Sequence, residues 1–324
     1  MSNISSSARL KNSKLCSSHI SIEKDATLTD VEIKAKEIVV KSGAILTGCK
    51  IFSDGNVVIG EKTTIKERTI INSFKSVSIG DHVIIDRDVF VGGMQSEKSA
   101  LEVGNDSVIL FRSYLNTTRK ITLGENVGVG GYCLIFTHSA WQNVLEGNPY
   151  KFADVEIKDN AWLPWNVTVL PGVTIEKDTT IGSGSTVTKN IPQSVFAAGI
   201  PAKIIRQKNT EQVSIEQKKI ILEDILSDFY QYAVSFLKLE HLRYSKEGNW
   251  TIEYKNARLI YALDFEHFGQ DDTILSFQVP DSIKKQNKWI DLDSKRSNSF
   301  DELTLHFISF VRRYGIKITT ENRS

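Results

Sequence analysis

An apolar residue that recurs every six positions over the first two thirds of the chain constrains the fold more than any other feature. The clearest run comprises Ile157, Leu163, Val169, Ile175, Ile181 and Val187. Shorter blocks with the same spacing begin at Ile59, Ile79, Val103 and Leu123. An α-helix repeats apolar residues every three or four positions, and a half-buried strand alternates them. A period of six therefore indicates neither an amphipathic helix nor a simple strand.

The six-residue unit suits one side of a triangular coil, in which a short strand is followed by a tight turn. The apolar residue of each unit and a small residue two positions before the next unit point inward. Glycine, asparagine and aspartate serve the corners, where a positive φ costs them little. One unit cannot bury its apolar face alone, but stacked coils can. Six consecutive units in one register therefore predict a mainly β fold, a parallel β-helix built from hexapeptide repeats.

The repeat has limits that define the expected domains. We expect a flexible N-terminal tail over 1–18 and the β-helix over 19–208. The apolar register is lost over 139–156, which predicts a loop that protrudes from the helix and is a candidate for function. A shorter interruption lies at 92–100.

Residues 209–324 lack the repeat and predict a small C-terminal α+β domain, whose role the sequence does not assign. An amphipathic helix is expected over 210–241, where Ile220, Ile225, Phe229 and Phe236 are among the residues at helical spacing. Strand-like runs follow, and then comes a second helix with Ser299 as its N-cap and Gly315 as its stop.

Composition excludes several classes of function. The chain has 40 basic and 39 acidic residues, so no strong field attracts nucleic acid. No window reaches the roughly 20 apolar residues that a membrane span needs, and no signal peptide is apparent, so we expect a cytoplasmic protein. Cys16, Cys49 and Cys133 form no CxxC pair and suggest no disulfide framework.

Three motifs near the end of the repeat point to a known family. They are Asp159, Asn160 and Trp162 in "DNAW", Pro171, Gly172, Val173 and Ile175 in "PGVTI", and Gly199, Pro201, Ala202 and Lys203 in "GIPAK". Together with the repeat and His138 at the start of the loop, they resemble the hexapeptide-repeat acyltransferases. The branch that looks closest is the sugar O-acetyltransferase-like one, with maltose and galactoside acetyltransferases and polysaccharide-cluster acetyltransferases. The resemblance covers roughly 20–206.

The resemblance implies a left-handed coil, which the spacing alone does not. It also implies acetyl-CoA as co-substrate, a sugar or saccharide as acceptor, and a homotrimer with active sites between subunits. No metal is expected, because His138 has no second histidine near it in the sequence.

The resemblance also implies roles for individual residues. His138 is the candidate general base, because imidazole can take the acceptor's proton and return it to the leaving thiolate. The acceptor attacks directly, without an acyl-enzyme. The backbone N–H of Trp165 is the candidate oxyanion donor, and Asn116 is a weaker candidate that would orient the acceptor. The family usually has glycine at the position of Pro164, and proline removes one backbone N–H there.

The binding candidates fall into two sets. The acceptor-binding candidates are Trp141, Trp162, Glu146 and Tyr150. The cofactor-binding candidates are Gly182, Ser183, Gly184, Lys203 and Arg206, of which the last two would meet the phosphates of coenzyme A.

The sequence as a whole predicts an acetyl-CoA-dependent O-acetyltransferase that acts on a sugar hydroxyl, in the biosynthesis of a surface polysaccharide such as capsule or lipopolysaccharide. One alternative is an N-acetyltransferase for a nucleotide-linked amino sugar, since the motifs do not separate O- from N-acetylation. An alternative of another class is a non-catalytic trimeric β-helix scaffold.

Overall fold

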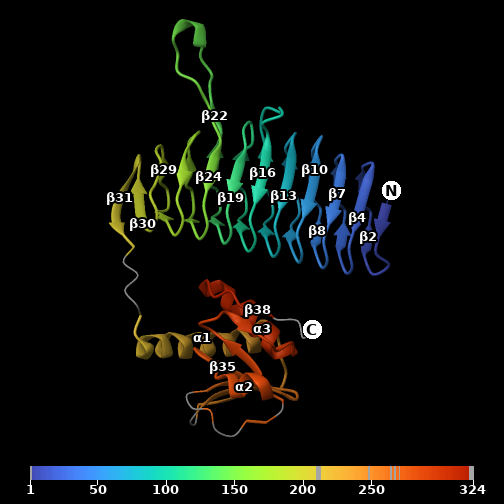
Figure 1. Ribbon diagram of the computed structural model, residues 1–324, viewed down its shortest axis with the longest axis vertical. Helices are drawn as coiled ribbons and strands as arrows, with labels where there is room; N and C mark the ends of the chain where they lie inside the picture. The colour runs from blue at the N-terminus through green and yellow to red at the C-terminus, as the bar shows by residue number, and fades with distance from the viewer. Residues whose placement is uncertain are drawn as a thin grey trace. The chain divides into compact units, whose positions relative to one another are not determined.

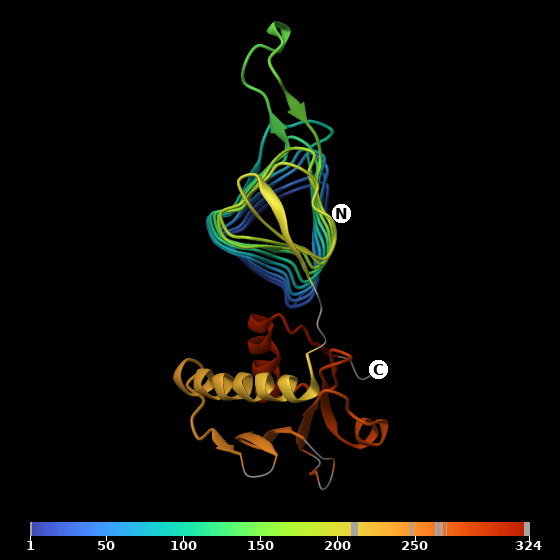
Figure 2. The same cartoon turned by 90° about the vertical axis from the view of Figure 1, so that its left-hand side faces the viewer.

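The computed structural model describes residues 2–208, 213–246, 249–262, 265, 268–269 and 271–320. The chain divides into two compact units, residues 1–209 and 210–324. The first unit is a left-handed parallel β-helix, as predicted. Its coils stack along one axis (Figure 1), and a view along that axis shows a triangular outline (Figure 2).

Three sheets, here named A, B and C in the order in which the chain visits them, form the sides of this prism. Sheet A contains β1 (Ser2–Ile4), β4 (His19–Ile22), β7 (Glu37–Val40), β10 (Asn56–Ile59), β13 (Ser76–Ile79), β16 (Ala100–Val103), β19 (Ile121–Leu123), β24 (Val155–Ile157) and β27 (Thr174–Ile175). Sheet B contains β2 (Arg9–Lys11), β5 (Thr27–Thr29), β8 (Ile45–Thr47), β11 (Thr64–Ile65), β14 (Ile84–Ile85), β17 (Val108–Ile109), β20 (Gly128–Val129), β25 (Trp162–Leu163), β28 (Thr180–Ile181), β30 (Val195–Gly199) and β31 (Ala202–Gln207). Sheet C contains β3 (Lys14–Cys16), β6 (Glu32–Lys34), β9 (Lys50–Phe52), β12 (Ile70–Asn72), β15 (Phe90–Gly92), β18 (Tyr114–Asn116), β21 (Leu134–Phe136), β26 (Thr168–Val169) and β29 (Thr186–Val187).

Neighbouring strands of each sheet come from successive coils and pair in parallel, except for the antiparallel pair β30–β31 that closes sheet B. The chain turns between sheets at three edges, which we call the A–B, B–C and C–A edges. Corner residues such as Asp88, Tyr132 and Asn160 have φ values of 59°, 58° and 59°. After glycine, asparagine and aspartate tolerate this left-handed conformation best, which explains why those residues recur at the predicted corners.

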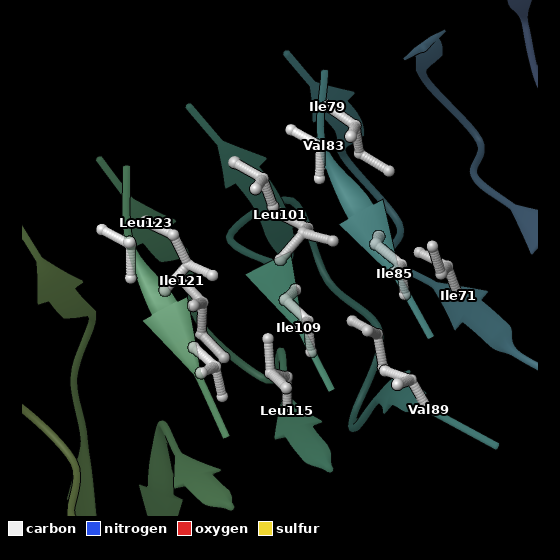
Figure 3. Close-up of a cluster of buried hydrophobic side chains, with 14 of the residues drawn as sticks. Ile71, Ile79, Val83, Ile85, Val89, Leu101, Ile109, Leu115, Ile121 and Leu123 are labelled. Carbon is white, nitrogen blue, oxygen red and sulfur yellow. The ribbon is translucent and has the colours of Figure 1, made fainter. Parts of the chain in front are cut away.

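The core of this unit is a column of aliphatic side chains that point into the prism from all three sheets (Figure 3). Ile85 and Ile109 from sheet B are fully buried, as are Leu101 from sheet A and Leu115 from sheet C. The predicted period of six is therefore the period with which the chain returns a side chain to this column.

Two adjacent residues of β14 should differ in how much they contribute to stability, because only one of them points into this column. Ile85 points inward and is 0% exposed, whereas Ile84 points outward and is 37% exposed. We expect Ile85→Ala to lower the free energy of unfolding by about 2–5 kcal/mol, and Ile84→Ala to change it by about 0.5 kcal/mol or less. Urea-induced unfolding measures both changes in free energy. Equal losses of stability in the two variants would contradict the conclusion that Ile85, and not Ile84, points into the core.

The flexible tail expected over 1–18 is not found. Strands β1, β2 and β3 form a first coil whose partners are β4, β5 and β6 of the second. The apolar signal there was weak because this coil is stacked on one side only. Leu10 is 39% exposed and Leu15 is only partly buried.

Pro164 removes one backbone hydrogen bond between neighbouring coils. At the equivalent corner position one coil earlier, the N–H of Gly130 donates to the carbonyl of Leu163 at 2.6 Å. Proline has no such donor, and β25 accordingly pairs with β28 only at Trp162 and Thr180.

The predicted loop leaves the prism at the C–A edge as a hairpin (Figure 2). Strand β22 (His138–Ser139) pairs antiparallel with β23 (Lys151–Phe152), and the 3₁₀ turn η1 (Val144–Glu146) lies between them. Asn143 caps this turn by accepting from the N–H of Leu145 at 3.1 Å. Gly147 ends it with a φ of 83°.

The second unit is an α+β domain with one seven-stranded mixed sheet. Its strands, in spatial order, are β32 (Arg243–Ser245), β33 (Trp250–Tyr254), β34 (Ala257–Tyr261), β35 (Asp272–Ser276), β36 (Lys288–Asp291), β37 (Arg296–Ser297) and β38 (Thr319–Thr320). Its helices are α1 (Ile215–Ser235), α2 (Asp281–Gln286), α3 (Glu302–Val311) and the 3₁₀ turn η2 (Arg312–Tyr314). Phe229 of α1 and Phe307 of α3 meet over the sheet, with ring centroids 5.3 Å apart.

The helix expected over 210–241 is shorter, because Ser214 forms a capping box with Gln217 and starts α1 at Ile215. Residues 210–212 lie outside the described residues. Ile220 and Phe236 were expected on the apolar face but are 62% and 71% exposed. Asp301 rather than Ser299 is the N-cap of α3, and Gly315 ends η2 with a φ of 74°.

Candidate active site

His138 lies at the C–A edge, where the chain leaves β21 and enters the hairpin. Its Nδ1 is 3.2 Å from Oδ1 of Asn116, the last residue of β18. Its ring centroid is 5.6 Å from that of Phe152 on the returning strand β23. The imidazole is half-buried, so it is held on one side and remains reachable on the other.

The amide of Asn116 determines which nitrogen of His138 carries the proton. Asn116 is 4% exposed, and its Nδ2 donates to the hydroxyl of Tyr114 at 2.8 Å. Its Oδ1 accepts from the N–H of Thr118 at 3.2 Å and therefore faces the histidine as an acceptor. Nδ1 of His138 must then be the donor, which leaves the lone pair of Nε2 free to take a proton from a hydroxyl.

The base of the hairpin is fixed by further contacts. Thr137 is fully buried, and its hydroxyl donates to the carbonyl of Asn116 at 2.5 Å and accepts from the N–H of Arg119 at 2.9 Å. The guanidinium of Arg119 lies 5.0 Å from the ring centroid of Phe152. The histidine thus sits on a rigid corner although it opens a long loop.

Trp162 and Trp165 lie elsewhere on the prism, on sheet B and at the B–C edge. Each indole covers a glycine of the preceding coil. A Cβ on Gly128 would lie 2.2 Å from the ring of Trp162, and a Cβ on Gly131 would lie 2.3 Å from the ring of Trp165. Only glycine permits these close approaches.

The expected backbone donors differ in availability. The N–H of Gly182 donates to Ala197 at 2.8 Å, and that of Gly184 donates to the carbonyl of Trp165 at 2.9 Å. Both N–H groups are therefore occupied by hydrogen bonds between coils. Among the described residues, the N–H groups of Trp165 and Ser183 donate to no backbone carbonyl.

Lys203 and Arg206 are exposed on β31, the outermost strand of sheet B. The guanidinium of Arg206 lies 5.6 Å from the ring centroid of Phe196 on β30. These two cations therefore stand on the same sheet as Trp162 and near the end of the stack that carries residues 182–184.

The acceptor candidates of the loop are spread along the hairpin. Tyr150 is 63% exposed, and its ring centroid is 6.4 Å from that of Phe152, which in turn faces His138. Trp141 is 99% exposed and touches little of its own chain. Glu146 accepts from Nδ2 of Asn143 at 2.9 Å and so holds the loop turn.

The structure brings together His138 and Asn116 at the C–A edge, and Trp162, Trp165 and residues 182–184 on sheet B and the B–C edge. It does not bring the candidate base and the candidate oxyanion donor together within one chain, because sheet C separates the two edges. Each edge thus carries half of the expected site.

Sequence reasoning missed Tyr114 and Phe152, which complete the surroundings of Asn116 and His138. The signal for Tyr114 was available, since it stands two residues before Asn116 and so points to the same outer face of sheet C. Phe152 could not be placed, because its position depends on where the hairpin strands pair.

Neither buried thiol offers an alternative nucleophile. Desolvation by burial raises the pKa of Cys133 to about 11 and that of Cys49 to about 12, so both are protonated near neutral pH. In the part of the chain that the structure describes, no three His, Cys, Asp or Glu side chains are grouped to hold a metal ion. No helix of that part is long and apolar enough for a membrane span.

No protein-family model matches the chain, but curated proteins do. Galactoside O-acetyltransferase of Escherichia coli K12 is 31% identical over 135 residues, or 41% of this chain and 64% of that protein. WbbJ of the same strain, by its name a candidate lipopolysaccharide biosynthesis O-acetyl transferase, is 28% identical over 169 residues, or 50% of this chain and 78% of that protein. The resemblance to hexapeptide-repeat acyltransferases is thereby confirmed.

The similarity to hexapeptide-repeat acyltransferases is partial in extent. The chain spans 64% of the E. coli galactoside O-acetyltransferase, and 45% of a fission-yeast (Schizosaccharomyces pombe) protein that is named as a candidate acetyltransferase and is 40% identical over 93 residues. Among solved structures, polysialic acid O-acetyltransferase OatWY aligns with 69% of this chain and 99% of its own, at 20% identity and a TM-score of 0.39.

Proposed function

We propose that the protein is an acetyl-CoA-dependent O-acetyltransferase that acts on a sugar hydroxyl in the biosynthesis of a surface polysaccharide. The observation that carries this proposal is the His138–Asn116 pair, which presents a free Nε2 at a rigid corner of an acyltransferase fold. The names of the relatives, galactoside O-acetyltransferase and WbbJ, support a sugar acceptor. A cytoplasmic location is part of the proposal, because acetyl-CoA is used inside the cell.

In the proposed reaction, Nε2 of His138 takes the proton of the acceptor hydroxyl while its oxygen attacks the thioester carbon. The backbone N–H of Trp165 stabilises the resulting oxyanion. The intermediate collapses with cleavage of the carbon–sulfur bond, and the imidazolium returns the proton to the coenzyme A thiolate. The products are the acetyl ester and free coenzyme A, so no acyl-enzyme is needed.

We further propose a homotrimer in which the C–A edge of one copy meets the B–C edge of the next, since either edge alone lacks half of the site. A threefold axis facing sheet C would place both edges of every copy against neighbours. The outer face of sheet C supports this arrangement, because an apolar row crosses it through Ile70, Phe90, Tyr114 and Leu134. Phe90 and Leu134 are 44% and 37% exposed in the single chain.

The test of the proposed function is release of coenzyme A from acetyl-CoA in the presence of sugars, oligosaccharides, nucleotide sugars and amino sugars. We expect release with a hydroxyl acceptor and formation of an ester that mild alkali cleaves. An amide product that resists mild alkali would instead show that the protein is an N-acetyltransferase. If the protein neither released coenzyme A nor bound acetyl-CoA, the non-catalytic β-helix scaffold would be the function that remains.

Asn116→Ala tests the tautomer argument. Without the amide, neither the orientation nor the Nδ1 proton of His138 is fixed, so we expect kcat to fall by about 10–100-fold, by analogy with partners that orient a histidine. The KM for acetyl-CoA should stay within a factor of about two, because Asn116 lies at the C–A edge whereas the candidate acetyl-CoA site lies at the B–C edge. Steady-state kinetics measure both, and Tyr114→Phe, which removes only the more distant hydroxyl, should have a smaller effect.

A further inference from the structure

The B–C edge carries a group of side chains that the proposed chemistry does not use. Phe111, Tyr132 and Trp165 occupy this edge in three successive coils, and their rings pack together at centroid distances of 5.2–6.3 Å. Tyr132 and Trp165 nevertheless remain 40% and 41% exposed. The cluster is therefore stable in itself and still offers ring surface to a ligand.

Two guanidinium groups flank this cluster. Arg112 lies 5.9 Å from the ring centroid of Tyr132 and donates to its hydroxyl at 3.0 Å. Arg87, one coil earlier, lies 5.9 Å from the ring centroid of Phe111. Both arginines are exposed. We call the five residues Arg87, Phe111, Arg112, Tyr132 and Trp165 the arginine–aromatic strip.

The nearby carboxylates are already engaged. Asp88 accepts from Arg68 at 2.6 and 2.9 Å, and Asp86 pairs with Lys66 at 3.1 Å. The hydrogen bond with Arg68 is the main cause that lowers the pKa of Asp88, and the charges of Arg112 and Arg87 lower it further. In the described part of the chain, no carboxylate lies within ion-pair distance of the Arg87 guanidinium.

The strip runs along the edge that also carries the candidate donor site. Gly182–Gly184 follow Trp165 at this edge by one coil, and Arg87 precedes Trp165 by three coils. Because neighbouring strands are about 4.8 Å apart, the strip extends about 15 Å from the proposed oxyanion position, away from the coenzyme A end. That is where an acceptor longer than one sugar would lie.

We propose that the strip binds an acidic saccharide, so that the acceptor is an oligosaccharide or polysaccharide whose sugars carry carboxylates. This inference rests on the proposed acetyl transfer and names its substrate class. The exposed rings stack on the apolar faces of the sugars, and the two guanidinium forks each bind a carboxylate through paired, charge-assisted hydrogen bonds. A neutral saccharide would use the rings but leave the guanidinium groups without an anion.

The test compares acidic oligosaccharides with their carboxyl-reduced, neutral counterparts as acceptors of full-length protein. The acidic panel contains oligogalacturonate, α2,8-linked oligosialic acid and hyaluronan oligosaccharides. We expect at least one acidic acceptor to have a kcat/KM about tenfold or more above that of its reduced counterpart. In Arg87→Gln/Arg112→Gln, the KM for that acceptor should rise about 10–100-fold, and the preference should fall toward unity.

Arg9→Gln is the matched control, because Arg9 is an exposed arginine of sheet B in the first coil, far along the stack from the strip. An unchanged preference in the double variant would overturn the proposal, and so would a neutral acceptor that is used as well as any acidic one. Loss of the trimer in the double variant would instead assign the strip to subunit contact. Absence of transfer to every saccharide, acidic or neutral, would refute the proposed function itself.

Discussion

Replacing His138 by alanine is expected to lower kcat for acetyl transfer by about 10²–10⁴-fold, the range typical of a lost general base. The side chain is half-buried, and among the described residues its hydrogen-bond partner is Asn116, so the fold and the binding of acetyl-CoA should persist. Coenzyme A release with the acceptor measures kcat, and isothermal titration measures acetyl-CoA binding.

The matched control for His138→Ala is His82→Asn. His82 occupies an A–B corner with a φ of 56°, a conformation that asparagine also tolerates. This variant should keep wild-type activity. If His138→Ala retained full activity, His138 would not be the base, and the free Nε2 would have no role in the chemistry.

Denaturing two inactive variants together and refolding the mixture is expected to restore activity if the site forms between copies. His138→Ala lacks the base at the C–A edge, and Ser183→Trp places a bulky ring at an exposed B–C corner where coenzyme A is expected. In trimers formed from equal amounts, about one quarter of the interfaces would combine two unaltered halves. Activity should then rise from near background to about a quarter of wild type.

The controls for this mixing experiment are each variant denatured and refolded alone, and the two variants mixed after separate refolding. Neither should recover activity, because no interface then contains both intact edges. Failure of the co-refolded mixture, despite mixed trimers demonstrated by differently tagged subunits, would mean that both halves of a site come from one chain. The edge-to-edge arrangement would then be wrong.

The β-helix was predictable because its signal is repeated. A misread position in one coil is corrected by the next, so the inward residues from Ile59 to Val187 could be identified without knowing any contact. The first coil was missed for the complementary reason. It has a neighbour on one side only, so Leu10 and Leu15 need not be as consistently apolar as the residues of an inner coil.

The site was less predictable than the fold. His138 could be singled out because it stands where the register breaks. That Asn116, 22 residues away, is its hydrogen-bond partner could be recognised only once the number of residues in each turn between β18 and β21 was known. Likewise, the sequence gives no sign that the N–H groups of Gly182 and Gly184 are occupied, since this depends on which carbonyl each corner meets.

The coil-on-coil stacking of the first unit has an evolutionary consequence. Each coil pairs only with the one before it and the one after it, so a whole coil can be gained or lost upstream of His138 without altering the geometry around the imidazole. Duplication of a single coil would lengthen the B–C edge by about 4.8 Å. Selection could thus adjust how many units of a polymer the molecule spans through changes in repeat number, independently of the residues that perform the chemistry.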